Sequence, residues 1–253
     1  MLNHPTLTKL DAMGLEGFAL ELREQLESNQ YRDLTFEERI GLLVDRELTL
    51  RDTKGLERRL KAAKLRIAAS VEDIDFKHPR KLDSSLLRNL AGGAWVRDKR
   101  NLLITGPTGV GKTYIACAMG HAACRQGFTA LYAQTSRLLH ELLVQKGDGR
   151  YLSTLKRLSK VGVLILDEWG FETPNADQRR ILLELLDDRY ERTSTIIVSQ
   201  FPTELWYEHL AEDPTLADAI LDRVLHNGYK LELQGESLRK KKRVLTREAL
   251  EAA

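Results

Sequence analysis

One glycine-rich segment constrains the fold of this chain more than any other. It directly follows the apolar run 101–105 and consists of Gly106, Pro107, Thr108, Gly109, Val110, Gly111, Lys112 and Thr113. This order is typical of a strand, a loop whose backbone N–H groups bind phosphate oxygens, and the start of a helix. Lys112 is placed to reach the β- and γ-phosphates, and the Thr113 hydroxyl to ligate Mg²⁺. The segment predicts a nucleoside triphosphate site.

Two carboxylates follow a second apolar run. The aliphatic residues 161–166 lead directly into Asp167 and Glu168. In an open parallel sheet, the carboxyl ends of the strands form the edge at which ligands bind. We therefore expect Asp167 to hold the Mg²⁺ shell and Glu168 to orient or deprotonate the attacking water. The alternative, an acidic turn that merely meets solvent, is disfavoured by the upstream phosphate loop.

Strands and helices alternate from about residue 76 onward. The predicted strands are 102–105, 130–133, 163–166, 195–199 and 229–233. The predicted helices between them are 114–126, 136–145, 177–191 and 216–226. Several strands are continuous aliphatic runs, as expected when helices cover both faces of a parallel sheet. The pattern predicts an α/β fold with a doubly wound parallel sheet.

The preceding part of the chain has a different pattern. Apolar residues recur there at three- and four-residue spacing, which is typical of helices. Thr35, followed by Glu37 and Glu38, indicates a helix start. We predict a small all-helical module over residues 1–69, a linker over 70–79, and a nucleotide-binding domain with a basic C-terminal tail over 80–253.

The distribution of charge is more informative than its total. The net charge is only +2, but one stripe is strongly basic. It contains Arg51, Lys54, Arg58, Arg59, Lys61, Lys64 and Arg66. Basic residues dominate around more than one turn of a helix, so we predict contact with DNA phosphates; a solvated helix face is the alternative.

The cysteines, histidines and apolar runs indicate the cellular compartment of the protein. Cys117 and Cys124 are too far apart along one predicted helix to form a disulfide, and we expect small buried thiols in a reducing compartment. The histidines show no metal-ligand spacing. No apolar run approaches the length of a membrane span, and no secretory leader is evident. We expect a cytoplasmic protein without a membrane partner.

The motifs together resemble those of a known family. The phosphate loop, the Asp167–Glu168 pair and the segment 218–223 resemble AAA+ P-loop ATPases of the clade that contains the DnaC-type helicase loaders. The segments 42–47, 72–76, 213–218 and 235–239 are more similar to the IstB family. Members of that family are ATP-binding helper proteins encoded beside the transposase of two-gene bacterial insertion sequences.

The resemblance implies roles for further residues. Arg223 matches the arginine finger that completes a neighbouring subunit's site; a surface arginine paired with an aspartate is the alternative. Gln200 matches the polar sensor of the γ-phosphate, with Ser199 as a rival. Arg239 is the first residue of the basic run 239–243 and matches a second sensor of the γ-phosphate. A charged tail is the usual explanation of such a run. Phe76 matches a residue that packs on adenine, unless it simply docks a linker on the core.

Basic residues between the second and third predicted strands also match the family. In this clade the region faces nucleic acid, which implies DNA contacts for Lys146, Arg150, Lys156 and Arg157. Such cations would neutralise phosphates without reading bases. A polar helix surface is the alternative.

These features predict one principal function and two alternatives. We expect a Mg²⁺-dependent ATPase that forms a ring or helical homo-oligomer on double-stranded DNA and assists a transposase in target selection. A DnaC-type helicase loader that binds single-stranded DNA is the first alternative. A small-molecule kinase with the same phosphate loop is the second, which the Asp167–Glu168 pair and the helical module disfavour.

Overall fold

The computed structural model describes residues 5–210 and 212–238. They belong to two compact units, which divide between Arg58 and Arg59. This division precedes residue 69 because the following residues pack into the second unit: Ala63 is fully buried, and Arg59 Nε donates to the carbonyl of Cys124 at 2.9 Å. The separate functions of the helical module, the linker and the nucleotide-binding domain stay a prediction.

The N-terminal unit is helical. It contains α1 (Pro5–Ala12), α2 (Glu16–Glu27), the short 3₁₀ helix η1 (Asn29–Tyr31) and most of α3 (Phe36–Ala63). Glu47 of α3 links the helices, because its Oε2 accepts hydrogen bonds from the backbone N–H groups of Gly17 and Phe18, at 2.8 and 3.1 Å. A carboxylate at these groups satisfies donors that have no partner within the first turn of α2.

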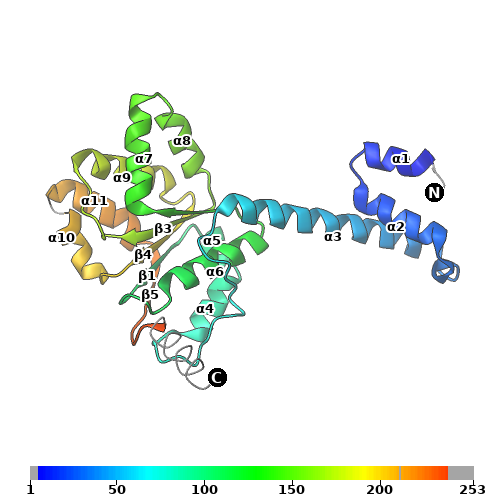
Figure 1. Cartoon of the computed structure of the whole chain (residues 1–253), viewed down its shortest axis with the longest axis horizontal. Coiled ribbons are helices and arrows are strands. Elements are labelled where there is room, and N and C mark those ends of the chain that lie inside the picture. Colours follow the sequence, from blue (N-terminus) through cyan, green and yellow to red (C-terminus); the bar gives the residue numbers. More distant parts are fainter. Residues whose placement is uncertain (1–4, 211, 239–253) are drawn as a thin grey trace, which may run out of the picture. The chain divides into compact units, whose positions relative to one another are not determined.

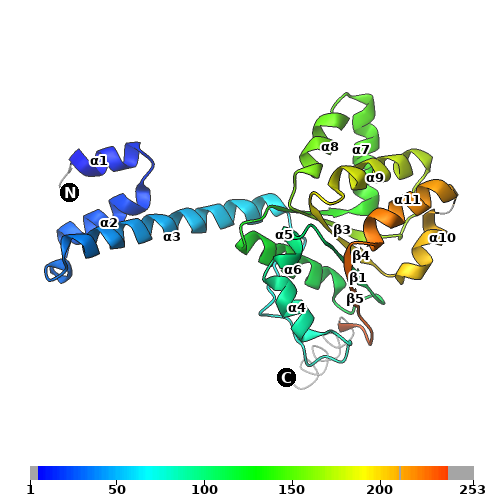
Figure 2. The same cartoon turned by 180° about the vertical axis from the view of Figure 1, so that it is seen from behind.

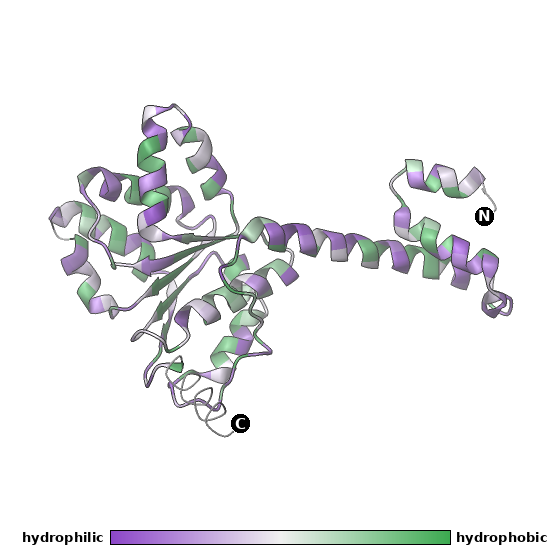
Figure 3. Cartoon of the chain, in the orientation of Figure 1, coloured by the Kyte–Doolittle hydropathy of each residue, from purple (hydrophilic) through white to green (hydrophobic). Residues whose placement is uncertain are grey.

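Both ends of α3 have a local cause. At its start, Thr35 Oγ1 accepts from Glu38 N, and Glu38 Oε2 accepts from Thr35 N, which is a capping box and confirms the predicted helix start. At its end, Lys64 has φ +49°, a left-handed conformation that stops the helix. Between these ends α3 is largely hydrophilic (Figure 3).

The second unit alternates strands and helices. Its strands are β1 (Asn101–Thr105), β2 (Ala130–Gln134), β3 (Val163–Trp169), β4 (Ser194–Ser199) and β5 (Gly228–Glu232). Its α-helices are α4 (Ser84–Ala91), α5 (Ala94–Arg97), α6 (Lys112–Arg125), α7 (Thr135–Gly147), α8 (Tyr151–Ser159), α9 (Ala176–Arg189), α10 (Trp206–Leu210) and α11 (Pro214–Leu225). The 3₁₀ helix η2 (Thr203–Leu205) precedes α10.

Among the residues described, the strands form one parallel sheet in the order β2-β3-β4-β1-β5. Helices α4 and α6 lie on one face, whereas α7, α9 and α11 lie on the other (Figures 1 and 2). This arrangement confirms the predicted α/β class with a doubly wound parallel sheet. All five predicted strands are present, and α4, α5, α8 and α10 lie outside the four predicted helix ranges.

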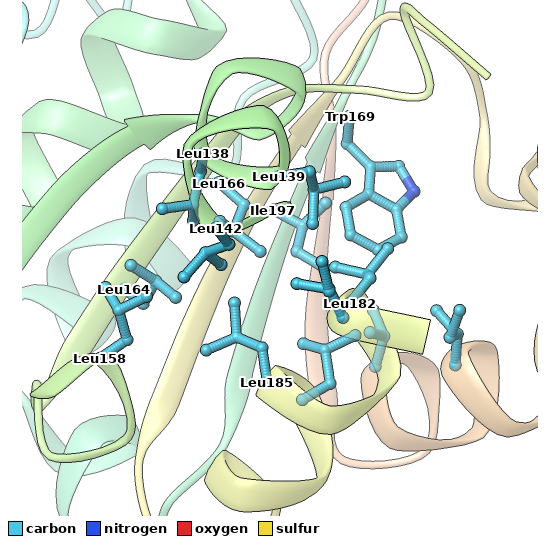
Figure 4. Packing of buried hydrophobic residues seen from close by; sticks show 14 of the residues in the cluster. Leu138, Leu139, Leu142, Leu158, Leu164, Leu166, Trp169, Leu182, Leu185 and Ile197 are labelled. Atoms are coloured by element: carbon cyan, nitrogen blue, oxygen red, sulfur yellow. The ribbon is translucent and has the colours of Figure 1, made fainter. Parts of the chain in front are cut away.

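One large hydrophobic cluster lies beneath α7, α9 and α11. Leu164 and Leu166 of β3 and Ile197 of β4 pack there against leucines of α7 and α9 (Figure 4). Each such side chain contributes about 1.5–3 kcal/mol when fully buried. The cluster holds the middle of the sheet rigid and leaves its carboxyl edge for polar residues.

Cys117 and Cys124 are both buried and free, as predicted. Burial raises the pKa of both thiols, so they remain protonated. In the part of the chain that the structure describes, none of the helices has both the length and the hydropathy needed to cross a membrane.

Replacing Gly17 by alanine is expected to lower the free energy of unfolding of the N-terminal unit by about 1–3 kcal/mol. An added Cβ would lie 2.7 Å from Glu47 Cα and 2.8 Å from the carbonyl oxygen of Arg46. The matched control is Gly41→Ala in exposed α3, where a Cβ would meet nothing within 4 Å and should add about 0.5–1 kcal/mol. Urea denaturation followed by circular dichroism measures both, and equal effects would contradict the close α2–α3 packing.

Candidate nucleotide-binding site

The phosphate loop occupies the turn from β1 to α6, at the carboxyl edge of the sheet. Gly111 is the N-cap of α6 and has φ +98°. At Gly109 a Cβ would lie 2.1 Å from Ser237 Oγ, so only glycine fits against the segment that follows β5. The residues at the amino end of α6 line an open cleft. The positive end of a helix dipole favours an anion there.

Lys112 begins α6 and turns back across the loop. Its Nζ donates to the carbonyl oxygens of Gly106 and Pro107, at 2.7 and 2.8 Å. The side chain is mostly buried, so its ammonium lies inside the curve of the loop where phosphates would bind. A cation held there adds to the positive potential of the helix terminus.

Asp167 connects β3 to the phosphate loop. Its Oδ2 accepts from Thr113 Oγ1 at 2.9 Å and from Tyr132 OH at 2.7 Å, and its Oδ1 accepts from Glu168 N at 2.9 Å. Burial raises the pKa of Tyr132; the hydrogen bond with Arg66 opposes this effect and the one with Asp167 adds to it, so the phenol stays protonated and able to donate. These contacts orient the carboxylate toward Thr113.

The donor set of Thr113 and Asp167 fits Mg²⁺. Both offer hard oxygen atoms, which Mg²⁺ prefers, and they lie side by side where the loop would present the β- and γ-phosphates. A hydroxyl and one carboxylate are the usual protein contribution when phosphates and water supply the other ligands. The predicted metal-binding pair is thus brought together by the fold.

Glu168 has an unusual backbone. Its φ is +61°, and the register between β3 and β4 shifts between Leu166 and Trp169. This left-handed conformation is costly for a residue with a Cβ, and such strain is typical of functional sites. The side chain reaches the same cleft, where Gln134 Nε2 donates to its Oε2 at 3.0 Å and Arg66 Nη1 donates to its Oε1 at 3.0 Å.

Gln200 and Ser199 have different surroundings at the end of β4. Gln200 is exposed, and its Oε1 accepts from Thr108 Oγ1 in the phosphate loop at 2.6 Å. Ser199 is fully buried, donates to the carbonyl of Trp169 at 2.8 Å and accepts from Phe201 N. Gln200 is therefore available to a ligand, whereas Ser199 holds β4 to the end of β3.

The cleft has a volume of about 610 Å³ and is bordered by two further segments. Ile74 and Arg80 come from the segment before α4, and Leu238 follows β5. Arg80 donates to the carbonyls of Val110 and Asp75, and burial lowers the pKa of its guanidinium. Leu238 N donates to the carbonyl of Gly109 at 3.0 Å. The volume falls within the range of sites that enclose a cofactor or nucleotide.

Comparison with known proteins agrees with this geometry. Residues 8–246 match the family model described as the IstB-like ATP binding protein. The chain belongs to this family. The protein y4pL of Sinorhizobium fredii, named as an ATP-binding protein of an insertion sequence, is 47% identical over 96% of this chain and 99% of its own length. The ATP-binding protein named for the insertion sequence IS21 of Pseudomonas aeruginosa is 34% identical over 95% and 90%.

Solved structures show the same fold at lower identity. The crystal structure of DnaI has a TM-score of 0.58 and 23% identity, covering 70% of this chain and 93% of its own. The DnaC helicase loader has a TM-score of 0.56 and 20% identity, covering 65% of this chain and 96% of its own. These similarities confirm the predicted AAA+ P-loop fold.

The residues predicted as arginine finger and adenine contact do not line the cleft of the described chain. Arg223 Nε lies 2.7 Å from Asp187 Oδ1, and Arg223 Nη1 lies 3.1 Å from Asp222 Oδ2, so within the chain it is an aspartate-paired arginine. The hydrogen bond to Asp187 raises its pKa. Phe76 lies under Arg88, whose Cζ is 5.2 Å from the ring centroid, and Ile74 is the apolar residue of that segment that lines the cleft. Arg239 lies outside the described residues.

The basic stripe does not form one uniform surface. Arg51 pairs with Glu47, and Lys54 with Glu16. Arg59 bonds to the backbone of Cys124, and Arg66 reaches Glu168. Arg58, Lys61 and Lys64 are exposed.

The second predicted set of DNA contacts lies on α7, on α8 and between them. Lys146, Lys156 and Arg157 are exposed, and Arg150 is exposed but paired with Asp148. Lys146 Nζ also lies 5.0 Å from the centroid of the Tyr151 ring. Lys156 and Arg157 lie between buried Leu155 and Leu158, so α8 packs its leucines on the core and exposes its charges to solvent.

Sequence reasoning missed several side chains of the site. Tyr132 and Gln134 belong to β2, where their alternation with apolar residues was the one available signal. The sequence predicts that Arg66 contacts DNA with the rest of the basic stripe. No sequence signal distinguishes it from the other basic residues as the one whose side chain lines the cleft. Arg80 carried no motif. Their positions depend on pairing of β2 with β3 and on the chain reversal after α3.

Gln200→Ala is expected to lower ATP turnover by at least about tenfold, because it removes a polar group aimed at the phosphate loop, with little effect on stability. Ser199→Ala is the matched variant and should instead lower the free energy of unfolding by about 1–3 kcal/mol, since buried partners lose their hydrogen bonds. Steady-state turnover and urea denaturation of both variants separate the roles. The reverse pattern would make Ser199 the sensor.

Proposed function

We propose that this chain is a Mg²⁺-dependent ATPase that assembles on duplex DNA and assists the transposase of an insertion sequence. The observation that carries the proposal is the joining of the phosphate loop to Asp167 and Glu168 through Thr113, in a family named for ATP binding. The names of the relatives connect them with insertion sequences. DNA, transposase and self-assembly are the partners that this function requires.

Each step of hydrolysis has a residue in position. The amide groups at the start of α6 and the Lys112 ammonium would bind the β- and γ-phosphates. Mg²⁺ held by Thr113 and Asp167 would neutralise developing charge on the phosphate oxygens. Glu168, one residue further along β3, would orient the attacking water and accept its proton. Gln200 would contact the γ-phosphate from the side of Thr108.

Lys112→Ala is expected to abolish ATP binding, and Glu168→Gln to preserve binding but slow hydrolysis by about 10²–10⁴-fold, because an amide cannot accept the proton. Glu172→Gln is a control that alters a nearby exposed carboxylate without changing turnover. Binding of a fluorescent ATP analogue and release of phosphate measure the two steps. Normal hydrolysis by Glu168→Gln would remove Glu168 from the role of base.

Assembly would complete the site through Arg223. Its side chain is 31% exposed on α11, where Asp187 of α9 holds it. An exposed ion pair of this kind is worth at most about 1 kcal/mol, so exchange of Asp187 for a phosphate on a neighbouring subunit is energetically accessible. ATP would then act first as an assembly ligand, and hydrolysis would weaken the contact.

Arg223→Ala is expected to leave ATP binding by single subunits intact and to slow hydrolysis by up to about 10³-fold. Asp187→Asn is the matched variant, because it removes the charged partner of Arg223 on α9, leaves Asp222 in place, and should preserve hydrolysis. Light scattering with duplex DNA and a non-hydrolysable ATP analogue should give large particles for wild type and smaller ones for Arg223→Ala. Wild-type particles that do not grow would overturn the assembly mechanism.

Several exposed cations support contact with duplex DNA. Arg58, Lys61 and Lys64 lie near the end of α3, and Lys156 and Arg157 on α8. They are distributed over separate helices rather than at one recognition surface. This distribution suits phosphate contacts that tolerate any sequence. Arg59 and Arg66 are better explained by their contacts within the second unit.

The helicase-loader alternative shares the fold but lacks the closer match. DnaI and DnaC are under 25% identical to this chain, whereas relatives named for insertion sequences reach 47% over nearly its whole length. A transposase is therefore the partner that we infer. Preference for single-stranded DNA and capture of a replicative helicase would favour the loader instead.

A further inference from the structure

An arginine from outside the recognised motifs reaches the carboxylates of the site. Arg66 follows the end of α3, and its Nη1 lies 3.0 Å from Glu168 Oε1, 3.4 Å from Tyr132 OH and 4.0 Å from Asp167 Oδ2. The contacts with Tyr132 and Glu168 raise the pKa of this guanidinium, so it remains a cation. Arg66 also lines the phosphate-loop cleft.

We propose that Arg66 is a positioning residue that restrains Glu168 within its own subunit and keeps basal hydrolysis low. The inference rests on the proposed ATPase function and concerns the regulation of that site. Arg66 acts through Glu168 and takes no part in the reaction itself. Hydrolysis accelerates when the pair opens and Glu168 is free to meet the attacking water.

Both carboxylate oxygens of Glu168 already accept hydrogen bonds from protein groups. Arg66 donates to Oε1 and the amide of Gln134 donates to Oε2, each at 3.0 Å. A general base must accept a hydrogen bond from water in line with the γ-phosphate. One donor therefore occupies each oxygen of Glu168, and neither protein group gives up a proton at neutral pH, so fewer acceptor positions remain for water.

The backbone of Glu168 is strained. A φ of +61° is unfavourable for glutamate, and it occurs where the β3–β4 register shifts. Such a conformation is strained and persists only where surrounding contacts over-determine it. The two side-chain hydrogen bonds are contacts of that kind. Loss of one would allow Glu168 to adopt another position.

The ion pair of Arg66 and Glu168 is accessible to solvent. The Arg66 side chain is 47% exposed and that of Glu168 is 33% exposed. Solvent and salt weaken such pairs, so this one can open without loss of the fold. Arg59 and Ala63 anchor the end of α3 on the second unit, and left-handed Lys64 reverses the chain so that Arg66 reaches the site.

The experiment compares Arg66→Ala with Arg66→Lys in the full-length protein, with Mg-ATP and without DNA. Arg66→Ala is expected to raise kcat by about fivefold, which corresponds to about 1 kcal/mol, the upper end for a solvent-exposed ion pair, with KM within about twofold of wild type. Arg66→Lys keeps a cation and should stay near the wild-type rate. Combining Arg66→Ala with Glu168→Gln should abolish the increase, because the increase acts through Glu168.

Arg180→Ala is the matched control. It removes an exposed arginine that pairs with Asp177 on α9, and the rate should not change. Arg66→Gln, which keeps most of the side-chain length, replaces Arg66→Ala if that variant fails to bind a fluorescent ATP analogue. A kcat equal to or below that of wild type in both neutral variants would overturn the restraint, and a fall would make Arg66 a stabiliser of transferred phosphate.

The outcome also separates this inference from the proposed function. If wild type hydrolyses ATP and Lys112→Ala does not, the ATPase stands whether or not Arg66 restrains it. If wild type binds ATP but turns over too slowly to detect, Arg66→Ala must give measurable hydrolysis that Glu168→Gln removes. Absence of ATP binding by wild type would refute the proposed function itself.

Discussion

The hydrogen bond between Thr113 and Asp167 is the interaction on which the site depends. It joins the first turn of α6, the helix that follows β1, to the end of β3. These two strands are not neighbours, because β4 lies between them in the sheet. A parallel sheet brings all strand ends to one edge, so the phosphate loop after β1 and the carboxylates after β3 face the same cleft. Tyr132 of β2 completes the arrangement by bonding to the same oxygen of Asp167.

Asp167 and Glu168 are neighbours in the chain, but the first is held rigidly and the second is strained. The leucine-rich cluster under α7 and α9 fixes the middle of β3, and Asp167 is almost fully buried at its end. Glu168, one residue later, has the left-handed backbone and partly exposed side chain of a group that can move. The fold therefore separates the fixed oxygen that we propose for metal binding from the movable carboxylate that we propose to be controlled by Arg66.

The cations of the chain illustrate how one residue type acquires different functions. Arg189 is buried among backbone carbonyls, and its burial lowers its pKa to about 9. Arg223 pairs with Asp187 at the surface, and Arg66 pairs with Glu168 in the cleft. Arg58 remains exposed on α3. Charge alone does not separate these roles, because each depends on the partner that tertiary structure supplies.

The sequence by itself determined the strand order along the chain, the phosphate loop and the two carboxylates after β3, because each is encoded by neighbouring residues. The pattern of apolar runs located every strand to within a few residues. Only the tertiary structure decided that Gln200 rather than Ser199 faces the loop, that Ile74 lines the cleft while Phe76 packs under Arg88, and that Arg66 reaches Glu168. Those contacts join residues far apart in the chain, so their geometry follows from how the strands pair and where the chain reverses, which no local pattern contains.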